Sequence, residues 1–542
     1  MYLYASNRTT FMPTETLTFR ETGYFSSLIC DYLDQKEELN SFYNRFPKLE
    51  NFKDQILEKS KSYPLEHRDV LASVLEKQYA GLEISETTSN HIELLRSEET
   101  YTITTGHQLN LFTGPLYFLY KIMSVVNLSK KLKETYPKQN FIPVFWMASE
   151  DHDFEEISFF NFRGQKVHWN KEASGGVGRL NTQGLDEVYS VFAAQLGGSF
   201  KAKKVKDLFQ KAYLQHDNLA TATRYLANEL FKDYGLVIID ADDSNLKRLF
   251  LPQIKNELLK KSTFKAVNET NQELESLGYK VQVNPREINL FYLNKGLRER
   301  IIQEGDRFKV NNTSIQWTEE ALLEDLQAHP ECFSPNVLMR PLYQEVILPN
   351  LCYIGGGGEM AYWFQLKESF KVQDVTFPIL LLRDSVLVRT EKQKEKQKAL
   401  EISNRDLFLE KNAFINKYVR RISNINIDFQ PQEDFLKQQF ADLYQLAEQT
   451  DKSFIGAVKA QEVKQLKGLK HLEKRLLKAQ KKVLADKIER STSLKDALFP
   501  NGNLQERNLN FSELFLEHGQ ELLSHLSDHL DPLDMRFLLL TI

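Results

Sequence analysis

Cysteine is scarce in this chain of 542 residues, which has only Cys30, Cys332 and Cys352. No two of them form a C-x-x-C pair, and three cysteines do not make an even disulfide framework. This usage favours a reducing compartment and argues against a structural zinc site. We expect the three thiols to be buried or idle.

Long hydrophobic runs are also missing. No apolar stretch approaches the roughly 18 residues that a membrane-spanning helix requires. The first residues, MYLYASNRTTFMPTETLTF, have neither a basic start nor a continuous apolar segment, so they do not resemble a secretory signal. We therefore expect a soluble cytoplasmic protein with no membrane partner.

An excess of positive charge is absent as well, because the formal net charge is −4. The whole chain thus has no polyanion-binding signature, and any nucleic-acid contact would need a local basic patch. What the chain does have is length and apolar content, with 42% hydrophobic and 11% aromatic residues. This is enough for two or three domains with sizeable cores.

The spacing of apolar residues changes along the chain and predicts its elements. Residues 1–95 are mostly helical in pattern, whereas TYTITTGHQ alternates and is rich in β-branched residues, as in a strand. A turn, LNLFTG, leads to a helix with Pro115 in its first turn, and NFIPVFWMAS then reads as a buried parallel strand. A strand-helix-strand unit of this kind builds a doubly wound α/β sheet.

The same alternation returns further along the chain. Residues 226–243 predict a helix, a glycine break and the strand VIID, followed by a helix for which Ser244 is a plausible N-cap. Residues 346–372 predict an apolar run, four glycines and a helix, and TFPILLLRDSVLV predicts one further buried strand. The mixed stretches 160–225 and 265–335 are interpreted as insertions into a core that is discontinuous in sequence.

These patterns divide the chain into four regions. A helical segment, 1–95, packs on a Rossmann-like catalytic core over 96–390, and a coiled-coil region follows over 391–490. The last region, 491–542, returns to the core, with RFLLLTI as a strand on its edge.

The coiled coil is predicted from a heptad pattern. Apolar residues occupy seven of nine seam positions, which are Ile455, Val458, Glu462, Gln465, Leu469, Leu472, Leu476, Ala479 and Val483. Residues 451–490 hold twelve Lys or Arg against five Asp or Glu. A solvated helix face explains this excess better than a nucleic-acid ridge, because interleaved aromatic residues are absent.

Three loops leave predicted strand ends, where ligands bind in open α/β sheets. In the first loop, TGHQLNLFTGP, Gly106 and Gly114 permit close backbone approach and the next helix offers free N–H groups to an anion. His107 and Gln108 are placed to orient or protonate a bound group. The candidate binding residues of this loop are Gly106, His107, Gln108, Asn110, Thr113 and Gly114. The alternative is a glycine turn with a capping histidine.

The second loop has four ionisable residues in succession, Glu150, Asp151, His152 and Asp153. They are costly to bury unless a ligand or a cationic partner engages them, so we predict that they are catalytic. Flanking carboxylates favour the charged form of His152, and a carboxylate here is suited to a substrate ammonium. The alternative is a helix N-terminus, which accounts for Asp153 and Glu155 but not for His152.

The third loop is the glycine run IGGGGE. Such a run sacrifices rigidity unless a ligand or a backbone passes very close. Glu359 either caps the following helix or binds ribose hydroxyls, and Tyr362 and Trp363 either contact an adenine or pack in the core. Arg383 either faces an anion or is paired within the fold. The candidate binding residues here are Gly355, Gly356, Gly357, Gly358, Glu359, Tyr362, Trp363 and Arg383.

A metal site is not predicted. His107, Asp151, His152 and Asp153 offer nitrogen and oxygen ligands, but the H-x-E and H-E-x-x-H spacings are missing. No tightly bound cofactor is evident either. The KIMS stretch at 121–124 lies inside a predicted core helix and is not read as a synthetase signature loop.

Taken together, several motifs resemble the family of the bacillithiol biosynthesis cysteine-adding enzyme. They are GHQLNLFTGPLYFLYKIMSVVNL, PVFWMASEDHDFEEI and RPLYQEVILPNLCYIGGGGEMAYWFQLK, with ETGYFSSLICDYL before them and the coiled coil after them. The resemblance covers nearly the whole chain. It implies a nucleotidyltransferase-like Rossmann core with two inserted connecting regions, and a coiled coil that joins subunits into a homodimer.

The resemblance also implies an activity. It is the condensation of L-cysteine with the amine of glucosaminyl-malate, with ATP and magnesium as the expected cosubstrate. His107 then has a binding or orienting role, and a HIGH tetrad is lacking, so adenylate formation is inferred from the fold alone. Two alternatives remain: a nucleic-acid- or tRNA-associated protein, tested by salt-sensitive RNA binding through Lys467, Lys470, Lys474 and Lys478, and a non-catalytic scaffold of a thiol-synthesis complex.

Overall fold

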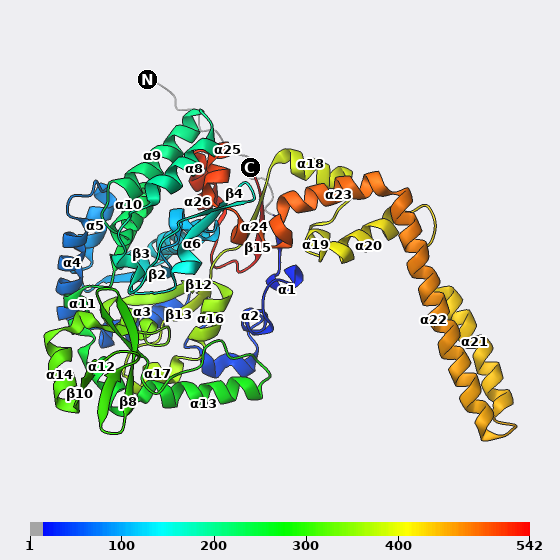
Figure 1. The fold of residues 1–542 in the computed structure, drawn as a ribbon, viewed down its shortest axis with the longest axis horizontal. Coiled ribbons are helices and arrows are strands. Elements are labelled where there is room, and N and C mark those ends of the chain that lie inside the picture. The colour runs from blue at the N-terminus through cyan, green and yellow to red at the C-terminus, as the bar shows by residue number, and fades with distance from the viewer. Residues whose placement is uncertain (1–14) are drawn as a thin grey trace. The chain divides into compact units, whose positions relative to one another are not determined.

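The computed structural model describes residues 15–542, and Figure 1 shows the helices and strands of this part of the chain. It divides into two compact units. The first is built from residues 15–20, 24–387 and 504–540, and it holds the larger sheets. The second is built from Glu21–Gly23, Val388–Asn503 and Thr541–Ile542, and it is mainly helical.

A parallel sheet of five strands organises the first unit, with the strand order β13-β12-β2-β3-β6. Its strands are β2 (Thr100–His107), β3 (Asn140–Met147), β6 (Val237–Asp240), β12 (Asn350–Gly355) and β13 (Ile379–Leu382). Because all the pairings are parallel, the carboxyl ends of the strands meet at one edge. At that edge Gly106 of β2 lies beside Trp146 of β3, and Gly355 of β12 lies beside Leu382 of β13.

Burial on both faces explains the composition of these strands. Every residue of β2 is buried, as is all of β3 after Asn140. Parallel strands with both faces covered are expected to be rich in apolar and β-branched residues throughout. The strands predicted within TYTITTGHQ, NFIPVFWMAS and VIID are confirmed.

The stretch TFPILLLRDSVLV forms two strands, so the prediction of a single strand is wrong. After β13 the chain leaves the parallel sheet at Arg383, and it resumes as β14 (Val386–Arg389) in a separate three-stranded sheet. That sheet has the order β1-β15-β14, with β1 (Glu15–Leu17) and β15 (Phe537–Thr541) antiparallel. RFLLLTI is therefore a strand, but it is the central strand of a small second sheet and not an edge of the core.

Helix α6 (Tyr117–Thr135) connects β2 to β3 and packs on both strands. It begins two residues after Pro115, because the preceding 3₁₀ turn Leu111–Thr113 and Gly114 place the proline in the lead-in segment. The helix α11 (Ser244–Leu249) is capped by Asp243 and not, as predicted, by Ser244. The Asp243 carboxylate accepts the N–H groups of Asn245 and Leu246 at 2.8 and 3.2 Å.

Helices precede the sheet in the described part of the N-terminal segment, as the apolar spacing predicted. They are α1 (Phe19–Thr22), α2 (Ser27–Leu33), α3 (Asn51–Ser62), α4 (Leu65–Tyr79) and α5 (Glu86–Leu94). Helix α3 packs near β12, and α4 packs near α11 and β6. The prediction for residues 1–14 lies outside the described residues.

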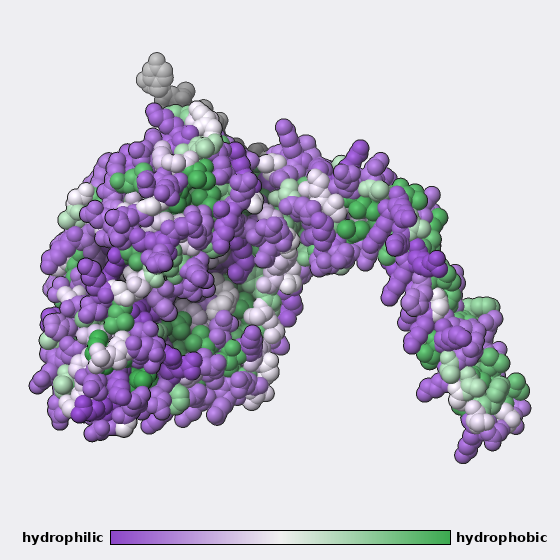
Figure 2. Space-filling model, viewed as in Figure 1, coloured by the Kyte–Doolittle hydropathy of each residue, from purple (hydrophilic) through white to green (hydrophobic). Residues whose placement is uncertain are grey.

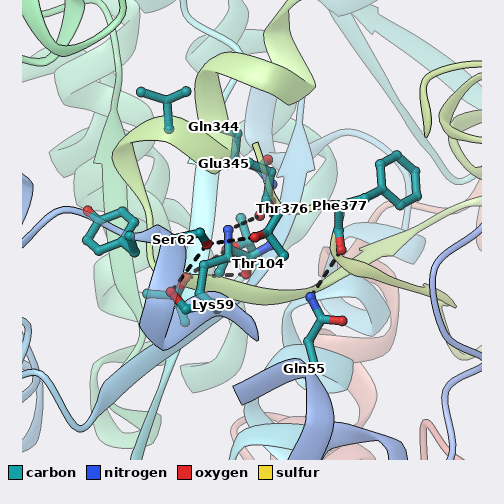
Figure 3. A network of polar contacts seen from close by, with 12 residues as sticks. Gln55, Lys59, Ser62, Thr104, Gln344, Glu345, Thr376 and Phe377 are labelled. Atoms are coloured by element: carbon teal, nitrogen blue, oxygen red, sulfur yellow. Dashed lines mark hydrogen bonds and ion pairs between the residues drawn. The ribbon is translucent and has the colours of Figure 1, made fainter. Parts of the chain in front are cut away.

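A buried polar network joins α3 to α15 (Arg340–Ile347) and to the sheet (Figure 3). Lys59 and Glu345 form an ion pair of 3.1 Å, and both side chains are almost fully buried. Glu345 also accepts from the side-chain amides of Asn350 at 2.6 Å and Gln344 at 3.0 Å. The hydroxyl of Thr104 on β2 donates to Asn350 at 2.9 Å. The network therefore fixes the start of β12 and the helix before it.

Two stretches interrupt the strand-helix alternation, near the predicted insertions. The first contains β4 (Phe159–Phe162), β5 (Gln165–His168), α8 (Leu185–Leu196), α9 (Phe200–Leu214) and α10 (Leu219–Phe231). The second contains α13 (Ser262–Ser276), β7 (Leu290–Asn294), β8 (Leu297–Glu304), β9 (Arg307–Val310), β10 (Gln316–Trp317), α14 (Glu319–Ala328) and β11 (Phe333–Pro335). The strands of the second form an antiparallel sheet in the order β10-β9-β8-β7-β11.

Shorter helices complete the first unit. They are α7 (Phe154–Ile157), α12 (Leu251–Lys260), α16 (Gly357–Trp363), α17 (Lys367–Val372), α24 (Gln505–Asn508), α25 (Phe511–His518) and α26 (Glu521–His529). Helix α16 directly follows β12, so its first residues lie at the carboxyl edge of the parallel sheet.

The second unit is a set of helices that includes a coiled-coil hairpin. Its helices are α18 (Glu391–Ala399), α19 (Asn404–Leu407), α20 (Lys411–Ile422), α21 (Gln430–Ala447), α22 (Lys452–Val483) and α23 (Ala485–Leu498). Helices α21 and α22 pack against each other around Phe440, Ala447 and Val458. The predicted coiled coil is confirmed.

The predicted heptad register holds only for the first part of α22. Val458 is buried as expected, but Leu472 and Val483 are 53% and 75% exposed, and Leu477 is buried instead. The reason is a change of partner along α22, because Leu477 packs with Val419 of α20 and with Ile427. A single heptad cannot describe a helix that leaves one neighbour for another.

None of the described helices has the length and hydropathy that crossing a membrane requires.

Candidate active site

A cavity of about 680 Å³ opens at the carboxyl edge of the parallel sheet. It is lined by residues that end or follow β2, β3 and β12, and by residues of β7, β8 and α15. Ligands take this position in open α/β sheets, where loops from neighbouring strands converge. Parts of all three predicted loops line the cavity, namely Gly106, His107, Gln108, Glu150, Asp151, His152, Gly356, Gly357, Gly358 and Glu359.

Asp151 is an ionised carboxylate in this cavity. The side-chain amide of Gln108 donates to its Oδ2 at 2.9 Å, and the backbone N–H of His152 donates to its Oδ1 at 2.7 Å. Burial alone would raise the pKa of Asp151, but the hydrogen bonds from His152 and Gln108 and the charge of Arg298 hold this pKa well below its usual range. Asp151 is therefore ready to accept a cationic or N–H group of a ligand.

His152 contacts an arginine that the sequence did not suggest. The Nη1 of Arg298, on β8, lies 2.7 Å from Nδ1 of His152, whereas Oδ1 of Asp151 lies 3.6 Å from the same nitrogen. Since a guanidinium only donates hydrogen bonds, Nδ1 of His152 accepts from Arg298 in the tautomer with its proton on Nε2, and it faces Asp151 as a donor in the tautomer with its proton on Nδ1. The inserted sheet thus brings a cation to the ring that the prediction from the flanking carboxylates did not include.

Glu150 belongs to a chain of charged side chains that extends to Arg179 at the surface. Its carboxylate forms an ion pair with Lys247 of α11, and the ammonium of Lys247 also lies 3.9 Å from Asp242. Asp242 in turn is bound by Arg179 through two hydrogen bonds of 2.6 and 2.7 Å. Burial raises the pKa of Glu150, and Lys247 opposes this rise. The chain of pairs compensates the cost of burying Glu150 and anchors the loop.

Asp153 does not line the cavity, although the sequence placed it among the catalytic candidates. Its side chain accepts the backbone N–H of Glu156 at 3.2 Å and caps the short helix α7. This is the capping alternative that the acidic residues after β3 left open.

Gly106 and His107 end β2 at the edge of the cavity. A Cβ on Gly106 would lie 3.1 Å from the hydroxyl of Tyr353, so a larger residue would displace this side chain by a few tenths of an ångström. Burial lowers the pKa of His107 to about 3, helped by the charge of Lys121 and opposed by Glu359 and a hydrogen bond to the Thr113 backbone. His107 is therefore neutral, and its Nε2 is buried without a hydrogen-bond partner.

Asn110, Thr113 and Gly114 do not line the cavity. They build the turn before α6, in which Phe112, Thr113 and Gly114 all have positive φ. A Cβ on Gly114 would lie 2.6 Å from Cβ of Asn110, so the turn itself requires this glycine. Gly114 therefore serves the geometry of the turn and does not contact the cavity.

Glu359 follows the glycine run and is held by three groups. It accepts from the hydroxyl of Tyr353 at 2.7 Å and from the backbone N–H of Gly356 at 2.8 Å, and it pairs with Lys121 at 2.5 Å. Burial would raise the pKa of Glu359, but Lys121 and these hydrogen bonds lower it. Glu359 is thus the cap of α16, while Gly355, tightly packed on Tyr353 and Glu359, does not line the cavity.

The two aromatic residues of α16 have different positions. Tyr362 lines the cavity. Trp363 is fully buried and stacks on Tyr353, with ring centroids 4.5 Å apart, and it also contacts Phe370 and Phe377. The core-packing alternative for Trp363 is therefore the observed one.

Arg383 lines the cavity and is paired at the same time. Its Nη1 and Nη2 donate to the buried carboxylate of Glu506 at 3.1 and 2.7 Å, while its Nε has no hydrogen-bond partner. The predicted alternatives, an anion site and a structural pair, are thus combined in one side chain. Glu506 comes from α24, more than a hundred residues further along the chain.

Several lining residues were not identified from the sequence. They are Tyr117, Lys121, Trp146, Arg286, Phe291, Arg298, Arg300, Arg340, Tyr353 and Arg507. Lys121 lies near the start of helix α6 among apolar residues, where a lone buried lysine is a usable signal. Arg298 and Arg300 have no comparable signal, since they alternate with other polar residues on a strand of the insertion.

The donor set does not fit a resident metal ion. Among residues 15–542 no group of three His, Cys, Asp or Glu side chains is arranged to hold one. Cations outnumber carboxylates in the lining of the cavity: Lys121, Arg286, Arg298, Arg300, Arg340, Arg383 and Arg507 face Glu150, Asp151 and Glu359. Such a cavity is suited to an anionic ligand.

Comparison with known proteins assigns the chain to a family. Residues 12–384 match the family described as "Bacillithiol biosynthesis BshC, N-terminal Rossmann-like domain", and residues 386–542 match "Bacillithiol biosynthesis BshC, C-terminal coiled-coil domain". The chain belongs to the BshC family. The Rossmann-like fold and the coiled coil that the sequence predicted are those of the family.

Curated relatives are similar to this chain over nearly its whole length. The chain is 57% identical to a protein of Flavobacterium johnsoniae, over 98% of this chain and all of the relative. It is 56% identical to a protein of Christiangramia forsetii and 38% identical to one of Cytophaga hutchinsonii, over 98% and 96% of this chain and 99% and 97% of the relatives. Each of these BshC relatives carries the name "Putative cysteine ligase BshC".

Proposed function

We propose that the protein is a ligase that joins L-cysteine to the amine of glucosaminyl-malate, as the last step of bacillithiol synthesis. Membership of the BshC family and the names of its relatives support this proposal. The observation in the structure that carries it is Asp151, an ionised carboxylate held by Gln108 in a cavity that otherwise has an excess of cations. An amine that is part of an anionic molecule fits this combination.

We also propose that the reaction depends on ATP with magnesium. Amide formation requires that the cysteine carboxylate be activated, because a carboxylate is a poor acceptor for an amine. Transfer of a phosphoryl or adenylyl group to it, with release of ADP or pyrophosphate, creates a leaving group. The substrate ammonium first loses one proton to the solvent. The neutral amine then forms the C–N bond while phosphate or AMP departs, and a second proton passes from the nitrogen to a base. The cations of the cavity would stabilise the phosphate charge.

Two residues of the second loop have distinct parts in this scheme. Asp151 binds the substrate ammonium, and His152 is the base that accepts the proton. To accept at Nε2, the ring must carry its other proton on Nδ1, where Oδ1 of Asp151 lies 3.6 Å away. This requires that Arg298 release Nδ1, which a ligand anion that binds Arg298 would achieve.

The test is mass spectrometry of the purified protein incubated with L-cysteine, glucosaminyl-malate, ATP and magnesium, next to a control without ATP. We expect a bacillithiol mass that depends on ATP. Product in the control without ATP would overturn the nucleotide dependence alone. No product with ATP, restored by cell lysate, would mean that a further cosubstrate or partner is required, and no product even with lysate would overturn the ligase activity.

We propose further that the coiled coil joins two copies of this chain. Apolar side chains lie exposed on the hairpin, among them Phe435 at 68% and Leu472 at 53% exposure, and Figure 2 shows apolar residues gathered on its visible face. Phe435, Leu436, Leu469 and Leu472 line one apolar groove between α21 and α22. A patch of this kind on a charged helix pair is typical of an interface. A mass of two chains in solution by light scattering is expected, and a mass of one chain would overturn the proposal.

The proposed location is the cytoplasm. The three cysteines are free thiols in the structure, as a reducing compartment requires. The protein is purified from cells without a reductant, denatured and treated with a thiol reagent. We expect the reagent to label all three cysteines.

A further inference from the structure

One end of the cavity contains buried donors and acceptors that nothing in the described residues satisfies. They are Nη2 of Arg340, Nε of Arg383 and Nε2 of His107. Arg383 and His107 are 3% and 7% exposed, so water does not replace the missing partners freely. Buried polar groups in folded proteins are almost always paired, and an unpaired charged donor is the most costly exception. These three side chains line the cavity, and their free atoms indicate a missing ligand.

Two glycines leave the space beside these arginines open. A Cβ on Gly106 would lie 3.8 Å from Nη1 of Arg340, and a Cβ on Gly356 would lie 3.7 Å from Nε of Arg383. Larger side chains at the two positions would extend into the volume next to the guanidinium groups. The glycines of the first and third loops thus keep one common space free.

Both arginines are fixed before any ligand arrives. Arg383 is held by Glu506, while Nη1 of Arg340 donates to the side chain of Gln344 at 2.9 Å. Gln344 donates in turn to Glu345, whose carboxylate pairs with Lys59 in the network of Figure 3. Arg340 also lies over the rings of Trp146 and Tyr353, at 5.6 and 5.5 Å from their centroids. Preorganised guanidinium groups bind carboxylates with little loss of side-chain entropy.

This end of the cavity has two positive charges that no carboxylate neutralises. Four cationic groups, Lys121, Arg340, Arg383 and Arg507, line it, and Lys121 is neutralised by Glu359 and Arg383 by Glu506. His107 is neutral, because burial lowers its pKa to about 3. Its hydrogen bond to the Thr113 backbone raises this pKa, which means that the ring donates there and that the free Nε2 accepts. The end therefore matches a ligand with two negative charges and a hydroxyl group.

We infer that this end is the subsite for the dicarboxylate of the amine acceptor, with Arg340 as its main ligand, and this rests on the proposed function. The malate part of glucosaminyl-malate supplies two carboxylates, and the adjoining sugar supplies hydroxyl groups for His107. Arg340 lies beside Gly106 at the end of β2, Asp151 follows the neighbouring strand β3, and Arg340 and Asp151 line the same cavity. In the acceptor the amine-bearing carbon is bonded to the carbon that carries malate. One molecule can thus place its carboxylates at Arg340 and its amine at Asp151.

The test is calorimetric binding of glucosaminyl-malate, without cysteine or nucleotide, to the wild type and to Arg340→Gln. Methyl glucosaminide, which lacks malate, is the comparison ligand, and Arg307→Gln, on an exposed strand of the insertion outside the cavity, is the control variant. We expect the wild type and the control to prefer glucosaminyl-malate. Arg340→Gln is expected to lose about 10- to 100-fold of this affinity, with binding of methyl glucosaminide unchanged.

Three results would overturn the inference: no binding of glucosaminyl-malate to the wild type, unchanged affinity in Arg340→Gln, or a loss of ATP binding in Arg340→Gln with acceptor binding retained. The last would assign the subsite to a phosphate. Thermal unfolding checks that Arg340→Gln is folded, and Arg340→Lys, which keeps the charge but not the planar fork, replaces it if it is not. Binding is measured without turnover, so acceptor binding by a wild type that forms no product separates this inference from the ligase proposal.

Discussion

The cavity of the first unit and the helix α22 of the second are both rich in charge, but their charges have different roles. Around the cavity, Arg383 is buried and Glu150 and Glu359 are half-buried, and each has a partner from a distant part of the chain. On α22 all the lysines except the half-buried Lys481 are exposed to solvent. A buried charge without a partner costs several kcal/mol, whereas an exposed one costs almost nothing. A charge therefore constrains the fold only where it is buried, because only there does it need a partner.

Apolar residues show the reverse contrast. In the first unit they are sequestered on both faces of the sheet, while α21 and α22 leave Phe435, Leu472 and Val483 exposed. These exposed side chains form the surface that we propose as the interface with a second copy of the chain. The comparison predicts that substitutions of charge are severe at the cavity and mild on α22, and that apolar substitutions on the hairpin affect assembly and not catalysis.

The largest effect is expected for Asp151→Asn. The substitution keeps the shape and an acceptor for Gln108 but removes the charge that binds the substrate ammonium. We expect kcat to fall by about 10²- to 10⁴-fold, measured as bacillithiol formation. Asp153→Asn is the matched control, because Asp153 is the neighbouring capping residue outside the cavity. More than a third of wild-type activity in Asp151→Asn would contradict the assignment.

Next in size is the loss of stability in Lys59→Met. This change leaves Glu345 buried without its cation, and breaking such a pair typically costs about 3–5 kcal/mol. Urea unfolding followed by tryptophan fluorescence measures it, because all four tryptophans, Trp146, Trp169, Trp317 and Trp363, belong to the first unit.

Lys309→Met is the control for Lys59→Met. Lys309 pairs with Glu304 at the surface, where a pair contributes about 1 kcal/mol or less. Equal losses in the two variants would show that burial does not set the strength of these pairs.

A pH effect is expected from His107. Its folded-state pKa is about 3, below its ordinary value near 6.5. Between these values the unfolded chain binds a proton that the folded chain does not, so stability falls as the pH is lowered from 6.5 toward 3. The slope is at most about 1.4 kcal/mol per pH unit. His107→Gln removes this contribution, so its free energy of unfolding should depend less steeply on pH, whereas His471→Gln, on the exposed surface of α22, should follow the wild type. Parallel pH curves for wild type and His107→Gln would refute this.

Assembly is the target of Leu472→Glu. A charge in the exposed apolar groove of the hairpin should convert a dimer to a monomer, read as a halved mass by light scattering, because desolvating a carboxylate in an apolar interface is unfavourable. Gln461→Glu adds the same charge at an exposed position of α22 outside the groove and should remain dimeric. Dimers in both variants would place the interface elsewhere.

The smallest effect is expected when four lysines of α22 are replaced together by Gln. They are Lys467, Lys470, Lys474 and Lys478. These side chains are exposed on α22, so ligase activity should stay within about twofold of wild type. Binding of RNA at low and at physiological salt is measured in parallel. Salt-sensitive RNA binding by the wild type that this variant loses would support the nucleic-acid alternative.

Much of the fold was predictable from local patterns. Eight buried residues in β2 and the apolar run of β3 identify parallel strands without reference to the rest of the chain. The break of TFPILLLRDSVLV at Arg383 was not predictable, because it depends on Glu506 and on the pairing of β14 with β15. The shifted seam of α22 was missed for a similar reason, since its partner changes from α21 to α20.

The candidate site was predictable only in part. Loops at strand ends identified Asp151, His152 and Glu359, because unusual residues at those positions need an explanation in any α/β sheet. The same reasoning also selected Gly114 and Trp363, but Gly114 is needed for a turn and Trp363 packs in the core. Arg298 and Arg340 were missed, since neither follows a strand of the parallel sheet.

The sequence by itself determined the parallel sheet, the coiled coil and the three loops at the edge of the sheet, because these depend on the periodicity and chemistry of neighbouring residues. Only the tertiary structure decided which charges in that edge are already neutralised and which are free. Glu359 is paired with Lys121 and Arg383 with Glu506, whereas Arg340 keeps an unpaired donor in the cavity. Whether a charge has a partner is a matter of distances of a few ångströms between residues far apart in the chain.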